Sequence, residues 1–257
     1  MVDNTKRFDG LADVYDLNRP DYPAAIMERL AAMVASIEGP RSCLDVGCGT
    51  GISTRALARA LPGWAIVGLE PNADMLARAT AASGALPAIR YLEGPAETLP
   101  TGDATLSLLT AAQALHWFDR PRFYDEVSRT LVPGGLLAIL YNNRKTAESK
   151  ALQSIEDALE GANPAYSRHY RDLPIADELR AWPAFRDVEV HEHTWIRQST
   201  LDAFVDYFLS RSFSKPVAEA RGKEATRRLF LDAAAPHAEN GMIAVPFVTV
   251  LTTARRR

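Results

Sequence analysis

The sequence predicts an α/β protein built on a doubly wound, mostly parallel sheet of seven strands, with helices on both faces and a helical cap insert. Five short, continuously apolar segments alternate with helical patterns between residues 41 and 143. Such alternation is typical of βαβ units whose strands are buried on both faces. Right-handed crossovers then give a doubly wound sheet. Two later β-rich segments can add to this sheet.

The expected elements follow one another in a regular order. A helix at 24–37 precedes the first strand. The buried strands are expected at 42–46, 64–69, 89–92, 106–109 and 136–141. The helices between them are expected at 52–61, 73–82 and 123–131. A Pro133-Gly134-Gly135 turn precedes the fifth strand.

The sequence changes character after Asn143. Residues 163–174 are polar and aromatic and predict a loop or a short helix. The two late strands are expected at 188–196, where apolar and polar residues alternate, and at 242–252. Further helices are expected at 150–160, 201–213 and 219–234. The helices between the late strands form an insert that the sheet does not need.

Composition excludes several classes of protein. Among 257 residues, 47% are hydrophobic and 24% are charged, which is the balance of a globular protein rather than a disordered one. The net charge of −3 argues against binding to a nucleic-acid backbone. Apolar runs end at about ten residues, too short for a membrane span. The polar residues 1–8 predict no signal peptide, and two cysteines without a CxxC motif fit a reducing cytoplasm.

A glycine-rich loop at residues 45–51 is the most informative segment. It reads Asp45-Val46-Gly47-Cys48-Gly49-Thr50-Gly51, follows a strand and opens a helix. Glycines there let the backbone pass close to a ligand. The dinucleotide fingerprint GxGxxG needs glycine at position 52, where this chain has Ile52, so an NAD-dependent oxidoreductase is disfavoured. Asp45 would repel a pyrophosphate and attract an ammonium group. A plain strand-to-helix turn is the alternative.

Four further landmarks come after this loop in a fixed order. They are Val67-Gly68-Leu69-Glu70-Pro71-Asn72, Glu93-Gly94-Pro95-Ala96-Glu97-Thr98-Leu99-Pro100, Gln113-Ala114-Leu115-His116-Trp117-Phe118-Asp119 and Val132-Pro133-Gly134-Gly135. At these residues the chain resembles the class I S-adenosylmethionine-dependent methyltransferases. The resemblance is strongest to the type 11 group, which includes trans-aconitate methyltransferase-like small-molecule enzymes. It covers residues 8–143 well and the final strand weakly.

The resemblance implies a Rossmann-like methyltransferase sheet that binds S-adenosyl-L-methionine and releases S-adenosyl-L-homocysteine. Glu70, at a strand end, can accept both ribose hydroxyl protons. The backbone of Ala96 would meet the adenine ring. Many relatives carry an acid where this chain has Pro95, and Glu97 is a possible substitute for that acid. The residues expected to bind the cofactor are Tyr15, Arg19, Asp45, Gly47, Cys48, Gly49, Gly51, Glu70, Pro71, Asn72, Met75, Ala96, Glu97 and Gln113.

Individual members of this set have other interpretations. Arg19 can pair with the cofactor carboxylate or lie on the surface of a proline-rich turn. Met75 can flank the adenine or belong to the core. Gln113 can contact the cofactor or the methyl acceptor.

The acceptor side of the site is expected beyond the fourth strand and in the insert. His116 is the candidate general base, and its alternative role is packing beside Trp117. Tyr207 and Arg211 are four residues apart on the helix expected at 201–213, so they would project from one face. The residues expected to bind the acceptor are His116, Trp117, Tyr141, Tyr166, Tyr170, Tyr207 and Arg211.

No metal site is expected. Glu189, His191 and His193 share one face of a strand, which could form a trio of ligands. An exposed strand face is the preferred interpretation.

Together these observations predict one domain over residues 1–257. It would comprise an N-terminal helical lid at 1–40, a cofactor-binding core at 41–143, and a region at 144–257 that completes the sheet and holds a substrate cap at about 198–241. The predicted activity is transfer of a methyl group from S-adenosylmethionine to an oxygen or nitrogen of a small metabolite, with no nucleic acid and no membrane as partner. A noncatalytic S-adenosylmethionine-binding regulatory protein is the alternative.

Overall fold

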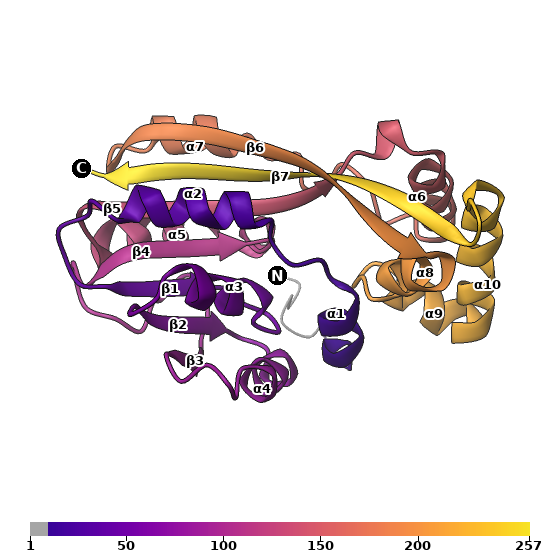
Figure 1. Cartoon of the computed structure of the whole chain (residues 1–257), viewed down its shortest axis with the longest axis horizontal. Helices are drawn as coiled ribbons and strands as arrows, with labels where there is room; N and C mark the ends of the chain where they lie inside the picture. The colour runs from indigo at the N-terminus through magenta and orange to yellow at the C-terminus, as the bar shows by residue number, and fades with distance from the viewer. Residues whose placement is uncertain (1–9) are drawn as a thin grey trace.

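One seven-stranded sheet organises the computed structural model, which describes residues 10–257 (Figure 1). The strand order is β3-β2-β1-β4-β5-β7-β6. The strands are β1 (Ser42–Val46), β2 (Ala65–Glu70), β3 (Ile89–Glu93), β4 (Leu106–Ala112), β5 (Leu131–Arg144), β6 (Phe185–Thr200) and β7 (Met242–Arg256). The first five run parallel, whereas β7 is antiparallel to both β5 and β6. The predicted fold class is therefore confirmed.

Two hydrophobic cores lie on the opposite faces of this sheet. One face is covered by α2 (Ala24–Val34) and α3 (Ile52–Ala60), the other by α5 (Arg120–Thr130) and α7 (Ile175–Ala181). Successive residues of a strand point to opposite faces, so β1 supplies fully buried Cys43 to the first core and Leu44 to the second. Burial on both faces explains why the strand sequences are continuously apolar.

A helical cap forms a third core beyond the end of the sheet. Strands β6 and β7 are longer than predicted, and Figure 1 shows them extending away from the other strands to reach this cap. The cap helices are α6 (Lys150–Ala162), α8 (Leu201–Leu209), α9 (Lys215–Arg221) and α10 (Lys223–Ala234). Buried Phe204, Phe208 and Phe230 pack there against Leu152 and Ile155 of α6. Helix α6 thus adds to the segment expected at 198–241.

Two helix predictions in the cap are wrong. Helix α8 ends at Leu209 because the Ser210 and Ser214 hydroxyls bind the carbonyls of Tyr207 and Phe208, at 2.6 and 2.7 Å. Arg211 therefore follows the helix and does not share a helical face with Tyr207. The single helix expected at 219–234 is also two helices, which Gly222 separates with a φ of +87°.

Helix α1 (Ala12–Asn18) lies between the sheet and the cap, as Figure 1 shows. Asp16 fixes α1 to the core through Arg55 of α3, at 2.7 Å, and Arg78 of α4 (Ala73–Ala82), at 2.9 Å. On the other side, Arg197 of β6 donates a 2.7 Å hydrogen bond to the carbonyl of Asn18. The helix is therefore held from both sides.

Over residues 10–257, no helix combines the length and apolar character needed to cross a bilayer.

A buried ionic cluster ties the cap to the end of β5. Glu156 of α6 is fully buried and accepts from Arg144 at 2.9 Å, Arg211 at 3.2 Å and the Tyr166 hydroxyl at 2.7 Å. Burial alone would raise the pKa of Glu156, but Arg211 and Arg144 outweigh it and lower the pKa to about 2. The carboxylate is therefore charged in the folded protein.

We predict that Glu156→Gln lowers the free energy of unfolding by about 3 kcal/mol, because two buried guanidinium groups lose their carboxylate. Urea denaturation of both proteins measures this difference. The matched control is Glu160→Gln on the same helix, whose partially exposed ion pair with Arg168 contributes at most about 1 kcal/mol.

The same cluster predicts a pH dependence. A carboxyl group with a lowered pKa stabilises the fold above its unfolded-state value of 4.5, and this contribution is lost as pH falls toward about 2. The stability difference between wild type and Glu156→Gln should therefore shrink across that window. A difference that stays constant would contradict the assigned charge state.

Candidate active site

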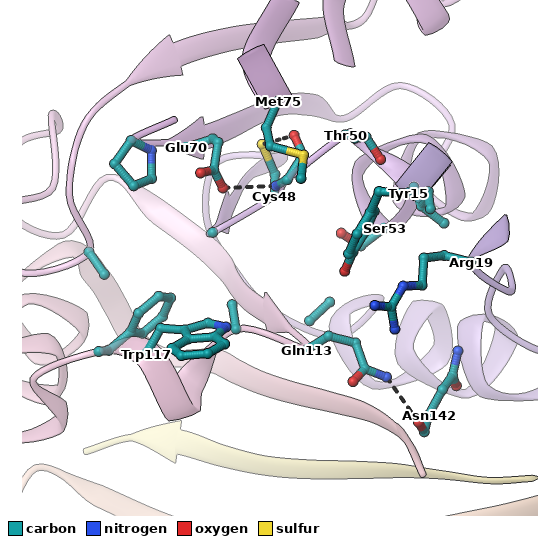
Figure 2. Close-up of a pocket in the computed structure, with 18 of the residues that line it drawn as sticks. Tyr15, Arg19, Cys48, Thr50, Ser53, Glu70, Met75, Gln113, Trp117 and Asn142 are labelled. Carbon is teal, nitrogen blue, oxygen red and sulfur yellow. Dashed lines mark hydrogen bonds between the residues drawn. The ribbon is translucent and has the colours of Figure 1, made fainter. Parts of the chain in front are cut away.

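A pocket lies at the carboxyl ends of β1, β2 and β4, between the sheet, the segment after α1 and the cap (Figure 2). Open parallel sheets place their ligands at this edge, where the strand order reverses. The predicted site residues in the wall are Tyr15, Arg19, Gly47, Cys48, Gly49, Glu70, Pro71, Met75, Ala96, Glu97, Gln113, Trp117 and Tyr207. Those outside the wall are Asp45, Gly51, Asn72, His116, Tyr141, Tyr166, Tyr170 and Arg211.

The glycine loop requires each of its three glycines. Gly47, Gly49 and Gly51 have φ values of +66°, +57° and +80°, which side chains rarely adopt. A Cβ on Gly47 would also lie 2.6 Å from the Ala114 Cβ, and one on Gly51 would lie 2.3 Å from the Tyr91 hydroxyl. A Cβ on Gly49 would meet no protein atom within 4 Å. Gly49 therefore leaves open space beside the loop for a ligand.

Glu70 ends β2 and lies in the pocket wall with only 8% of its surface exposed. Its Oε2 accepts from the Gly49 amide and its Oε1 from the Asn72 amide, both at 3.0 Å. Burial raises the pKa of this carboxyl, and the two backbone bonds oppose that effect. Each oxygen keeps a lone pair beyond these bonds, so the fixed carboxylate can accept from a ligand diol.

Asp45 differs from the expectation that it lies in the site itself. Its side chain is fully buried beneath the loop, and its oxygens accept from the hydroxyls of Ser53, Thr54 and Thr110, each at 2.7 Å. Burial raises the pKa of Asp45, which these donors oppose. Its route to a ligand is therefore indirect, through Ser53, which does line the pocket.

Arg19 lies across the pocket from Glu70, as Figure 2 shows. The guanidinium carbon is 4.4 Å from the centre of the Tyr15 ring and 5.0 Å from that of Tyr207. Its buried Nε has no hydrogen-bond partner in the described part of the chain. A buried donor without a partner is costly, so a ligand acceptor fits here.

These two ends match the ends of S-adenosylmethionine. The carboxylate of Glu70 suits the ribose diol, and the guanidinium of Arg19 suits the amino-acid carboxylate. The residues present therefore fit the predicted cofactor.

At the adenine end of the predicted site, two of the expected residues, Asn72 and Glu97, bind backbone amides of the protein. Met75 and Ala96 line the pocket, but Asn72 caps α4 by accepting from the Met75 amide at 2.9 Å. Glu97 accepts from the Asp119 amide at 2.8 Å, which uses one of its two carboxylate oxygens. Phe118, which sequence analysis did not single out, also lines this wall.

His116 lies behind the wall, with its Nδ1 3.0 Å from the Tyr141 hydroxyl. Its ring centre is 4.5 Å from that of Trp117 and 5.2 Å from that of Tyr170. Burial and the nearby charge of Arg171 hold the pKa of His116 well below its usual value. This surrounding of rings favours a packing role over a general base.

Arg211 and Tyr166 are likewise removed from the wall. Both bind Glu156, and the Arg211 Nη2 donates to the Tyr166 hydroxyl at 2.5 Å. Only 2% of Arg211 is exposed, and it supports the cap rather than facing the pocket. The sequence expectation of direct contact with the acceptor arose from the incorrect helix over 201–213.

Arg171, which was not predicted from the sequence, lines the pocket from the loop between α6 and α7. Its Nη1 donates to the Oε1 of Gln113. Gln113 in turn has a φ of +58°, unusual for a residue with a side chain, and donates to the Asn142 carbonyl at 3.2 Å. The irregular loop gives no periodicity from which Arg171 could have been identified.

Within residues 10–257, no three His, Cys, Asp or Glu side chains are grouped as a metal site.

Comparison with known proteins identifies the class. Residues 44–139 match a methyltransferase domain model. An uncharacterized methyltransferase of Mycobacterium tuberculosis is 32% identical, over 98% of this chain and 96% of that protein. The trans-aconitate 2-methyltransferase of Paracidovorax citrulli is 28% identical, over 83% of this chain and 86% of its own length. A proposed type II methyltransferase from Anaeromyxobacter dehalogenans has the same fold, with a TM-score of 0.68, 23% identity and coverage of 93% and 97%.

Fold, pocket and relatives agree that this is an S-adenosylmethionine-dependent methyltransferase. The chain belongs to the methyltransferase type 11 family. The predicted enzyme class and cofactor are thereby confirmed.

We predict that Glu70→Ala weakens binding of S-adenosylhomocysteine by about 2 kcal/mol, or roughly thirtyfold, because a charged acceptor is lost. Isothermal titration calorimetry measures the affinity. The control is Glu93→Ala, at the paired register position of β3 but exposed, which should leave the affinity unchanged. Equal affinities of wild type and Glu70→Ala would refute the assignment.

Proposed function

We propose that the protein methylates an oxygen or nitrogen of a small metabolite. The observation that carries this proposal is a pocket with Glu70 at one end and Arg19 at the other, bordered by side chains of the cap. Methyltransferases that act on small molecules are among its relatives, including trans-aconitate 2-methyltransferases. This supports a small acceptor.

The core residues would hold the cofactor in one orientation. Glu70 would accept from the ribose hydroxyls, the glycine loop would allow close approach, and Arg19 would bind the carboxylate. When bound, S-adenosylmethionine supplies a methyl group already activated by its sulfonium. The protein therefore has to orient the acceptor and exclude water rather than activate the methyl donor.

The acceptor side would be formed by residues from two parts of the chain, the segment after β4 and helix α8. Gln113 directly follows β4 and has a fixed side chain, Trp117 lies four residues further on, and Tyr207 comes from α8. Rings provide flat apolar walls, and the amide can orient a polar group. A general base is needed only for a nucleophile that retains its proton at neutral pH.

Calorimetry with S-adenosylhomocysteine and with NAD tests the cofactor, and transfer of radiolabelled methyl groups to metabolite extracts tests catalysis. We expect S-adenosylhomocysteine to bind, NAD not to bind, and label to appear in small molecules. Binding without transfer to any extract would favour the regulatory alternative.

For His116 we predict a packing role. His116→Asn should lower kcat/KM by disturbing the rings around it, while the pH–rate profile keeps its acidic limb. A general base fails when protonated, so loss of that limb in the variant would instead assign the base to His116. His169→Asn, at an exposed position, is the control and should change neither quantity.

A further inference from the structure

Two guanidinium groups in the pocket wall have no carboxylate partner within residues 10–257. Neither Arg19 nor Arg171 forms an ion pair with an acid of residues 10–257. The two acids in the same wall are Glu70, on the far side of the pocket, and Glu97, which binds the Asp119 amide. The cap side of the pocket therefore carries uncompensated positive charge.

A second pair of guanidinium groups adds to this charge from behind the wall. Arg144 and Arg211 share one carboxylate, that of Glu156. The Arg144 Nη1 also donates to the Tyr207 hydroxyl at 2.6 Å, which links this pair to the pocket. Four guanidinium groups thus lie in or behind the cap side of the pocket, and among residues 10–257 the carboxylate of Glu156 is the one that forms ion pairs with any of them.

These guanidinium groups also act on the pKa values of two nearby tyrosines. Burial alone would raise the pKa of Tyr207, but Arg144, Arg19 and Arg211 lower it to about 7. Burial would also raise the pKa of Tyr170, and Arg171, with the other three guanidinium groups, lowers it instead. Both shifts indicate a site that favours negative charge.

The cofactor does not neutralise this charge. S-adenosylmethionine carries a sulfonium, an ammonium and a single carboxylate, so it is itself a net cation. Its carboxylate accounts for Arg19 alone. Arg171 has no anionic partner among residues 10–257, so its guanidinium is available to bind a further anion in the pocket.

Arg171 is also held in place. Its guanidinium binds the Gln113 side chain and lies 5.3 Å from the centre of the Tyr170 ring and 5.8 Å from that of Tyr141. One guanidinium nitrogen is used by Gln113, so the others can donate to a planar oxyanion. A guanidinium held in one orientation favours ligands whose oxygen atoms match the geometry of its N–H donors.

We propose that the methyl acceptor is a small carboxylic acid whose carboxylate is bound by Arg171. This inference rests on the proposed methyl transfer at the same pocket. A carboxylate carries one negative charge, which matches the single guanidinium of Arg171, whereas a phosphate monoester carries close to two. Arg171 is then a specificity-determining residue, and Gln113 positions it.

Matched ligand pairs test this proposal, because they compare the chemistry of the acceptor's polar group rather than one chosen acceptor. Small aromatic and unsaturated carboxylic acids are compared with their primary amides and with phosphate monoesters of similar size. Binding is measured by calorimetry on protein saturated with S-adenosylhomocysteine, and turnover with radiolabelled S-adenosylmethionine. We expect acids to bind at least about tenfold more tightly than their amides, and more tightly than the phosphates.

The variant Arg171→Gln should weaken acid binding about thirtyfold and abolish the preference for acid over amide. Arg171→Lys, which keeps the charge but not the fork, should retain part of the preference. Arg180→Gln, an exposed arginine outside the pocket wall, is the control and should match wild type.

The outcomes separate this inference from the proposed function. S-adenosylhomocysteine affinity should be unchanged in Arg171→Gln, which also shows that the variant is folded. No acid binding better than its amide, a preference for phosphates, or an acid preference that persists in Arg171→Gln would overturn the assignment of Arg171. Failure of the wild type to bind S-adenosylhomocysteine would instead refute the methyl-transfer proposal.

Discussion

The geometry of the site depends on the hydrogen bonds that the buried carboxylate of Asp45 accepts. It accepts from Ser53 and Thr54 at the start of α3 and from Thr110 of β4, and so ties two strands and a helix together at one point. The glycine loop runs between these anchored ends, and the Gly49 amide then reaches Glu70. A buried polar network in which every acceptor is satisfied is rigid, so these three hydrogen bonds fix the junction. The position of the Glu70 carboxylate in the pocket wall therefore depends on the Asp45 carboxylate, which lies outside that wall.

Two regions of the molecule supply the charged groups of the pocket. The sheet edge supplies Glu70 and the glycine loop, which are fixed by strands and helix ends. Charge of the opposite sign comes from Arg19 beside α1 and Arg171 beside the cap. Tyr207 of the cap stacks on Arg19, while Asp16 binds the segment containing Arg19 to α3 and α4. Separate contacts therefore hold the negative charge of Glu70 at one end of the pocket and the positive charges of Arg19 and Arg171 at the other.

Sequence was sufficient for features that arise from local chemistry. Continuous apolar strands predicted the sheet. The spacing of Gly47, Gly49 and Gly51 predicted the loop, and Ile52 in place of a glycine disfavoured an NAD-dependent oxidoreductase. It failed where tertiary contacts override local pattern. Residues 201–213 are amphipathic throughout, yet serine hydroxyls end α8 at Leu209 and move Arg211 behind the wall. Arg171 stands in an irregular loop, and its role depends on Gln113, which lies 58 residues away in sequence.

In the proposed binding mode, one pocket holds S-adenosylmethionine between Glu70 and Arg19, with its methyl group toward the cap. A crystal structure of the protein with S-adenosylhomocysteine tests this binding mode. We predict ribose hydroxyls within hydrogen-bond distance of the Glu70 carboxylate, the amino-acid carboxylate at the Arg19 guanidinium, and the sulfur facing the space beside Tyr207 and Arg171. A ligand bound in the reverse direction, or bound elsewhere with Arg19 still unpartnered, would contradict the account.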